Sequence, residues 1–189
     1  MPFLLAAVGA MAMGAQPAQA EPASTAPAAA ERDGSHDFDW EIGTWATSVK
    51  VLRNPLSPKA TWIEFKGTSV IHALGGGLSN VVDLDVTGPT GRIRGVSLRL
   101  YNVQGRQWTL NFANMGDGLL TPPSVGEFKN GRGEFYGTDT LRGRTILVRF
   151  VILDVTQDSA RFEQSYSADG GKTWELNWIA TDRRLPAKP

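Results

Sequence analysis

Short stretches of alternating apolar and polar residues, separated by turns rich in Gly, Pro, Asn and Asp, recur from residue 44 to residue 184. Successive side chains of a β-strand point to opposite faces, so this alternation predicts strands with two unlike faces. No stretch of about 12 residues repeats apolar positions at helical spacing. The predicted strands are residues 44–53, 61–74, 79–86, 92–101, 106–113, 125–129, 132–136, 145–154 and 160–166, with a last strand after the turn at 167–174.

Each predicted strand is joined to the next by a short turn, and Asn130-Gly131 is the strongest two-residue hairpin signal. Sequential hairpins form an antiparallel meander, and a long meander removes its exposed edges by closing on itself. We therefore predict an all-β fold, a single antiparallel up-and-down barrel of about 8–10 strands. A β-sandwich is the alternative. A propeller is disfavoured because no repeat of about 40–50 residues is present.

The first 36 residues differ in composition from the rest. Residues 3–15 form an apolar run, and Ala18-Gln19-Ala20 provides a small-x-small cleavage site, so residues 1–20 are predicted to be a signal peptide. No Lys or Arg precedes the run, so either the start codon is misplaced or the α-amino group serves alone. Residues 21–36 are rich in Ala and Pro and are predicted to be a disordered linker. The barrel domain is then residues 37–185, in a periplasmic or secreted protein that leaves the membrane after signal cleavage.

Charge and composition narrow the function. Lys plus Arg and Asp plus Glu both number 19, and a zero net charge argues against a nucleic-acid partner. Cysteine is absent, which excludes disulfides and cysteine zinc sites, and only His36 and His72 are present. No metal site and no cofactor are therefore predicted. The oligomeric state is left open.

The turn SADGGKTW fits the pattern S-x-D-x-G-x-T-W and resembles an Asp-box, a hairpin motif of many secreted β proteins. Asp169 would accept hydrogen bonds from N–H groups of the turn, and Gly170 and Gly171 tolerate a positive φ. Trp174 would cover the turn. The motif carries no catalytic group, so its expected role is to hold the last hairpin in register and thereby help to close the barrel.

Gly43-Thr44-Trp45 resembles the G-x-W signature of lipocalins and other calycins. This resemblance implies that the tryptophan packs at the closed end of the barrel, under a basic residue of the last strand. Arg183 and Arg184 are the candidates for this basic residue, and we expect Arg184 to be the one that lies over Trp45. A cation over an indole contributes about 0.5–2 kcal/mol.

More of the chain is similar to a family of exported bacterial proteins of uncharacterised function with a lipocalin-like barrel. The matching segments, which span most of the chain from Asp37 onward, are DFDWEIGTW, GTSV followed by GGG, RGVSLRLY, VGEF followed by GRGEFYG, and RFEQSYSADGGKTWELNW. The resemblance implies a fold and carries no activity. His72 and Asp182 depart from the family pattern, the latter standing where an apolar residue is more usual.

Polar side chains that alternate with apolar ones form the candidate site. They are predicted to line a partly charged pocket inside the barrel, with Glu163 as the partner that Arg149 requires in an apolar strand. Alternatively they face solvent, and Leu98, Leu100, Trp108, Leu110, Val148, Phe150, Phe162 and Trp178 fill the core. The candidate ligand-binding residues are Arg99, Tyr101, Asn111, Arg149, Glu163 and Asn177.

The leading functional hypothesis is a binding protein that holds a small, partly hydrophobic molecule in the barrel. One alternative is a hydrolase or isomerase that uses carboxylates such as Glu163 and Glu175. Another is a structural or interaction module. The direction of Arg149, into the barrel or out of it, is the observation that best tests the predicted pocket.

Overall fold

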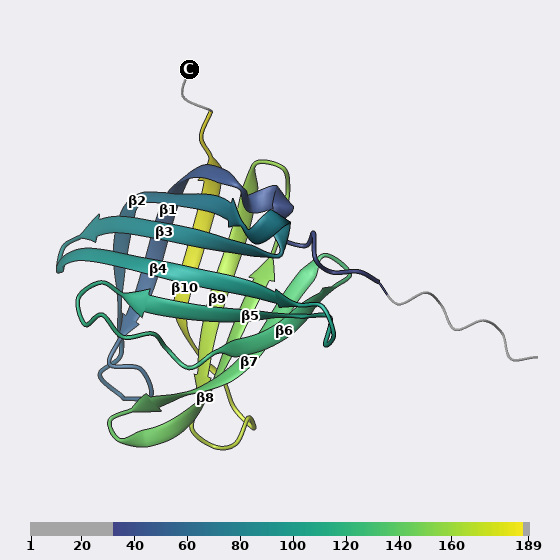
Figure 1. Cartoon of the computed structure of the whole chain (residues 1–189). Coiled ribbons are helices and arrows are strands. Elements are labelled where there is room, and N and C mark those ends of the chain that lie inside the picture. Colours follow the sequence, from purple (N-terminus) through teal and green to yellow (C-terminus); the bar gives the residue numbers. More distant parts are fainter. Residues whose placement is uncertain (1–31, 187–189) are drawn as a thin grey trace, which may run out of the picture. The chain divides into compact units, whose positions relative to one another are not determined.

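The computed structural model describes residues 32–186, and these contain one closed barrel of ten antiparallel strands (Figure 1). Every strand pairs with its neighbours in sequence, and β10 closes the barrel against β1. The all-β up-and-down barrel is confirmed. The strands are β1 (Gly43–Arg53), β2 (Thr61–Leu74), β3 (Ser79–Gly88), β4 (Gly91–Asn102), β5 (Gln107–Asn114), β6 (Ser124–Lys129), β7 (Arg132–Leu141), β8 (Arg144–Leu153), β9 (Ser159–Ser167) and β10 (Glu175–Arg184).

Two short 3-10 helices, η1 (Asp39–Glu41) and η2 (Gly75–Gly77), are the only helical elements of the described residues. The hairpin predicted at Asn130-Gly131 joins β6 to β7, with φ of 52° and 77° at the two residues. Asn and Gly suit this turn because both positions are left-handed. The predicted signal peptide and most of the predicted linker lie outside the described residues.

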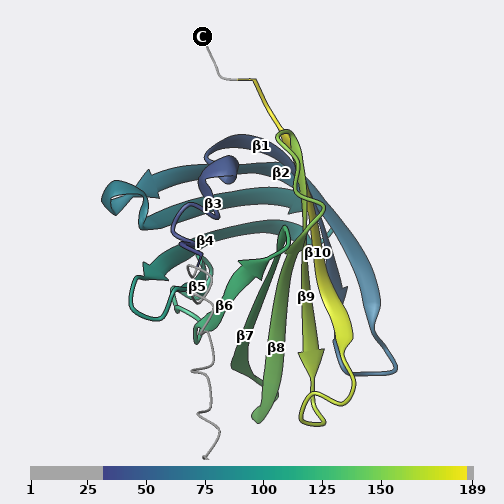
Figure 2. The ribbon, with the colours of Figure 1, turned by 90° about the vertical axis from the view of Figure 1, so that its right-hand side faces the viewer.

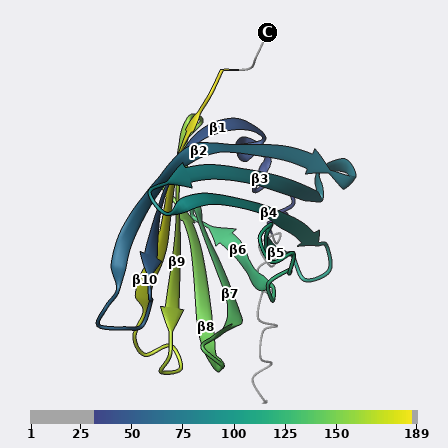
Figure 3. The ribbon, with the colours of Figure 1, turned by 90° about the vertical axis from the view of Figure 1, so that its left-hand side faces the viewer.

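The ten strands form two walls that cross each other. Figures 2 and 3 show β2, β3 and β4 running across one side, at a steep angle to β7, β8, β9 and β10 on the other. Along each strand every second side chain points inward. Paired residues of neighbouring strands point to the same side, so the register carries the inward face from one strand to the next. The interior between the walls is therefore lined by all ten strands.

The residues before β1 fold against one end of the barrel. Phe38 is 1% exposed and packs edge-on to Trp108, with ring centroids 4.8 Å apart. Trp45, at the start of β1, is fully buried under Trp40. Gly34, in the segment predicted as linker, accepts a hydrogen bond of 2.8 Å from the Trp108 indole. This end, where β1 begins and β10 ends, is called the closed end below.

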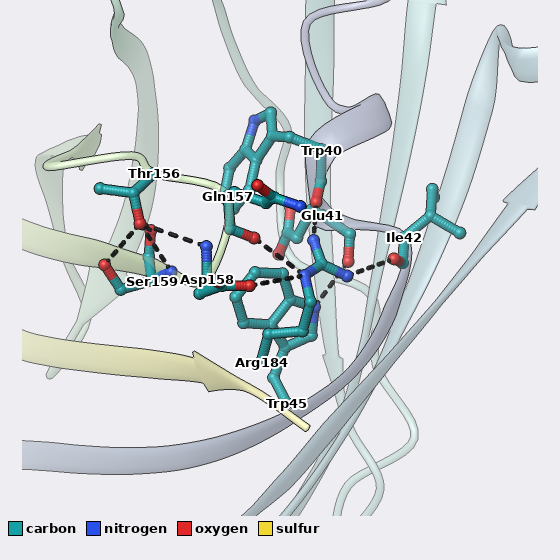
Figure 4. A network of polar contacts seen from close by, with 9 residues as sticks. All are labelled: Trp40, Glu41, Ile42, Trp45, Thr156, Gln157, Asp158, Ser159 and Arg184. Carbon is teal, nitrogen blue, oxygen red and sulfur yellow. Dashed lines mark hydrogen bonds and ion pairs between the residues drawn. The ribbon is translucent and has the colours of Figure 1, made fainter. Parts of the chain in front are cut away.

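Arg184 makes the contact expected of a terminal arginine at the closed end (Figure 4). Its guanidinium lies 4.1 Å from the ring centroid of Trp45. Nη1 donates to the carbonyl of Ile42 and Nε to that of Gln157, both at 2.9 Å. Nη2 donates to the carbonyl of Trp40. One side chain thus links the end of β10 to η1 and to the β8–β9 loop.

The β9–β10 hairpin holds Asp169 in a dense set of hydrogen bonds. Its Oδ1 accepts from the Thr173 amide at 3.0 Å and from the Ser167 hydroxyl at 2.8 Å. Its Oδ2 accepts from the Thr173 hydroxyl at 2.6 Å. These bonds, led by that of the Thr173 side chain, lower the pKa of Asp169 to about 2. The kinship of this hairpin with the Asp-box stays a prediction.

Candidate ligand-binding site

A cavity of about 320 Å³ lies inside the barrel and is lined by η1 and all ten strands. Ligand pockets of folded proteins typically measure about 300–1,000 Å³. The middle of the cavity is apolar because the inward positions of β1, β3, β5, β8, β9 and β10 carry aliphatic and aromatic side chains there. These wall residues are Val49, Val82, Leu84, Leu110, Phe112, Val148, Phe150, Phe162, Trp178 and Ala180.

The cavity floor, next to the closed end, carries a buried ion pair. Glu41 of η1 is 2% exposed and Arg99 of β4 is 4% exposed. Nη1 and Nη2 of Arg99 donate to the two carboxylate oxygens of Glu41, the Nη2 bond measuring 3.1 Å. The guanidinium also lies 4.4 Å from the ring centroid of Phe38. A two-pronged pair of this kind is among the stronger hydrogen-bonded contacts in proteins.

Asp182 of β10 is the second carboxylate of the floor. It is 5% exposed, and burial, the largest cause, raises its pKa to about 7. The negative charge of Glu41 raises this pKa further, whereas the Thr47 hydroxyl and Arg99 lower it. Thr47 faces Asp182 across the β1–β10 pair and shares a hydrogen bond of 2.8 Å with Ser69. The floor thus combines one neutralised ion pair with one carboxyl that titrates near neutrality.

The opposite end of the cavity is polar. Asp139 of β7 and Tyr166 of β9 line it there. Burial, followed by the charge of Asp139, raises the pKa of Tyr166. The loop between β5 and β6 folds back over this end, where Thr121 exchanges hydrogen bonds with Phe112 and accepts one from the Asn111 amide. The cavity therefore changes along its length from a charged floor through an apolar wall to a polar end.

The six predicted ligand-binding residues are not brought together. Arg99 and Asn111 line the cavity. Tyr101 lies deeper in the closed end, where its hydroxyl accepts from the Gly34 amide at 3.1 Å. Asn177 sits at a bulge of β10, and its amide oxygen accepts from Gln164 at 3.1 Å.

Arg149 and Glu163 face away from the cavity. Arg149 alternates with Val148 and Phe150, which line the cavity, so it points out of the barrel. Its guanidinium lies 4.8 Å from the Trp174 ring centroid. Glu163 pairs with Arg161 at 2.7 Å, which corrects the expected Arg149–Glu163 pair.

The inward face is thus polar at Arg99 on β4 but apolar on β8. Neither prediction, a polar set that lines the pocket or a polar set that faces solvent, therefore holds for the whole barrel. Leu100, which the solvent-facing interpretation placed in the core, is 43% exposed. Sequence reasoning missed Glu41, Thr47 and Ser69 as lining residues. Asp182 was marked only as a departure from the family pattern. The acidic residue at this position was the one signal in the sequence that could have indicated a lining residue. An Asp that takes the place of an apolar, inward residue is costly to bury, so its presence suggests a function.

Among residues 32–186, no group of three or more His, Cys, Asp or Glu side chains is arranged to hold a metal ion. No helix in that range has the length and apolar character needed to cross a membrane. The carboxylates proposed for catalysis do not line the cavity, and Glu175 instead accepts a hydrogen bond from the Leu56 amide.

No protein-family model matches the chain, and no curated protein matches its sequence. Among solved structures it is similar to the S-type phycobiliprotein lyase CPES from Guillardia theta, with a TM-score of 0.58 and 13% identity. That match covers 83% of this chain and 95% of the lyase. A second likeness, to EF1p2_mFAP2b bound to DFHBI, has a TM-score of 0.45 and 10% identity and covers 80% of this chain and 99% of that one. The likeness to the lyase shows the fold alone, which is a closed barrel of ten antiparallel strands.

Proposed function

We propose that this barrel is an exported binding protein that holds one small, partly hydrophobic molecule in its cavity. The observation that carries the proposal is the cavity of about 320 Å³, whose apolar wall stands between a charged floor and a polar end. A ligand with an apolar body gains free energy from this wall in proportion to the area that it buries. The few polar groups at the ends would set its orientation.

The lyase similarity supports the proposal only by way of the fold. Export rests on the predicted signal peptide, residues 1–20. N-terminal sequencing of the mature protein tests it, with cleavage expected after Ala20. No observation favours a reaction, because Glu163 and Glu175 do not line the cavity.

Native mass spectrometry of the protein purified from its own source is the first experiment, with a co-purified small molecule as the expected result. A neutral fluorescent probe, N-phenyl-1-naphthylamine, then tests the cavity directly. Ala180 lines the wall, so Ala180→Trp fills the cavity and is expected to lower probe affinity about tenfold or more.

The matched control is Thr181→Trp, on the adjacent outward position of the same strand, which is exposed. It is expected to bind the probe like the original protein. Equal binding by the two variants would place the probe outside the cavity. Absence of both a retained molecule and probe binding would refute the proposed function.

A further inference from the structure

The floor of the cavity contains buried polar atoms that have no partner among residues 32–186. One of them is Oδ1 of Asp182. This residue lines the cavity and is only 5% exposed. A buried carboxylate oxygen without a hydrogen bond costs several times what an ordinary hydrogen bond contributes. A group that donates to this oxygen from inside the cavity would remove that cost.

The charges of the floor indicate the sign of that group. Glu41 and Arg99 neutralise each other through two hydrogen bonds, so the pair contributes no net charge. Asp182 adds one negative charge when it is ionised.

We propose that the ligand carries a single cationic, hydrogen-bond-donating head group, such as a protonated primary amine, which binds Asp182 while the apolar body lies along the cavity wall. This inference rests on the proposed function of the cavity. A cationic head balances the charge of the ionised floor and supplies donors to the unpartnered oxygen.

An anionic head fits less well. The two terminal nitrogens of Arg99 are already engaged by Glu41, which leaves only Nε without a partner among the described residues. A bound carboxylate would bring a further negative charge beside Glu41 and Asp182, in a site where water screens charge poorly. The floor therefore selects against an anion.

The proposal predicts a pH dependence. The charged groups that face Asp182 are Glu41 from η1 and Arg99 from β4, while Thr47 on β1 and Ala160 on β9, its strand partners, are neutral. Burial raises the pKa of Asp182 to about 7, and a primary alkylamine stays protonated to about pH 10. Affinity for the amine is expected to rise as the pH rises through 7, because Asp182 loses its proton.

The test uses three probes with one apolar body: octylamine, 1-octanol and octanoate, titrated calorimetrically into the full barrel at pH 8 and pH 5.5. At pH 8 octylamine is expected to bind about tenfold or more tightly than octanol, as a charge-assisted hydrogen bond predicts. Octanoate is expected to bind more weakly than octanol. At pH 5.5 the advantage of octylamine over octanol is expected to shrink severalfold.

Asp182→Asn keeps the shape of the side chain and removes its charge, so it is expected to abolish the advantage of octylamine while octanol affinity stays within about twofold. Asp83→Asn makes the same change at an exposed position of β3 and is expected to retain the advantage. If octanol binds in the cavity but octylamine binds no better, or if Asp182→Asn keeps the advantage, the cationic head group is refuted and the cavity function stands. If none of the three probes binds, the cationic head group is refuted, and the proposed function fails with it when the retained molecule and the binding of N-phenyl-1-naphthylamine are also absent.

Discussion

Two aspartates, one in the β9–β10 hairpin and one within β10, show how differently the same residue behaves in two regions of this barrel. Asp169, in the hairpin before the strand, accepts hydrogen bonds from Ser167 and Thr173 and has a pKa lowered to about 2. Asp182, near the end of the strand, is buried with an unpartnered oxygen and has a pKa raised to about 7. Hydrogen-bond donors stabilise the first charge, and the exclusion of water destabilises the second.

The difference separates two roles. In the hairpin, neighbouring residues donate all the hydrogen bonds that the Asp169 carboxylate accepts, so its charge is stabilised locally. The floor of the cavity keeps one carboxylate oxygen, Oδ1 of Asp182, without a partner beside the Glu41–Arg99 ion pair, at some cost in stability. Such uncompensated polar groups are characteristic of functional sites rather than of structural ones.

The largest expected effect is at the ion pair of the floor. Arg99→Met leaves Glu41 buried without its partner and is expected to lower the free energy of unfolding by about 3–5 kcal/mol, measured by urea denaturation. Arg149→Met, on the outer face over Trp174, is the matched control and is expected to cost about 1 kcal/mol or less. The double variant Glu41→Gln, Arg99→Met should recover part of the loss; a double loss equal to the sum of the single ones would contradict the pairing.

Asp182→Asn is expected to stabilise the protein at neutral pH. A pKa raised from about 3.9 in an unfolded chain means that the folded state binds the extra proton between about pH 4 and pH 7. Stability therefore falls as the pH rises through this window, by about 1–4 kcal/mol. In Asp182→Asn this fall should disappear in denaturation curves recorded at several pH values, and an unchanged pH profile would show that Asp182 is ionised throughout.

Arg184→Gln should weaken the closed end. The substitution removes a cation from the Trp45 ring and breaks hydrogen bonds to backbone carbonyls, with an expected loss of about 1–3 kcal/mol in chemical denaturation. Arg183→Gln, on the adjacent exposed position, provides the control and should change stability by less than about 0.5 kcal/mol. Equal effects of the two substitutions would assign the loss to surface charge.

The smallest effect is expected at the exposed hairpin carboxylate. A lowered pKa contributes stability that is present above about pH 4 and is lost as the pH falls towards 2. Asp169→Asn should therefore destabilise the protein at neutral pH and converge with the original protein near pH 2, opposite in sign to Asp182→Asn. The carboxyl titration of Asp169, followed by NMR, checks this directly; a midpoint near 4 would contradict it.

The interior of the cavity was harder to predict than the barrel. Arg99 on β4 and Arg149 on β8 stand in similar alternating patterns, yet the first points inward and the second outward. Glu41 was not predicted as the partner of Arg99, because the two residues are 58 positions apart and meet only when η1 folds against the closed end.

The sequence by itself determined the order of the strands, their number (about 8–10) and the hairpin turns, and the resemblance of Gly43-Thr44-Trp45 to a known signature implied the contact of a terminal arginine with Trp45. Those features depend on local alternation, on residues suited to tight turns and on a short motif at each end of the domain. Only the tertiary structure decided which face of each strand lines the cavity, because an alternating pattern is equally compatible with either face until neighbouring strands fix it. It also decided the state of Asp182, since a pKa depends on water and charges supplied by distant parts of the chain.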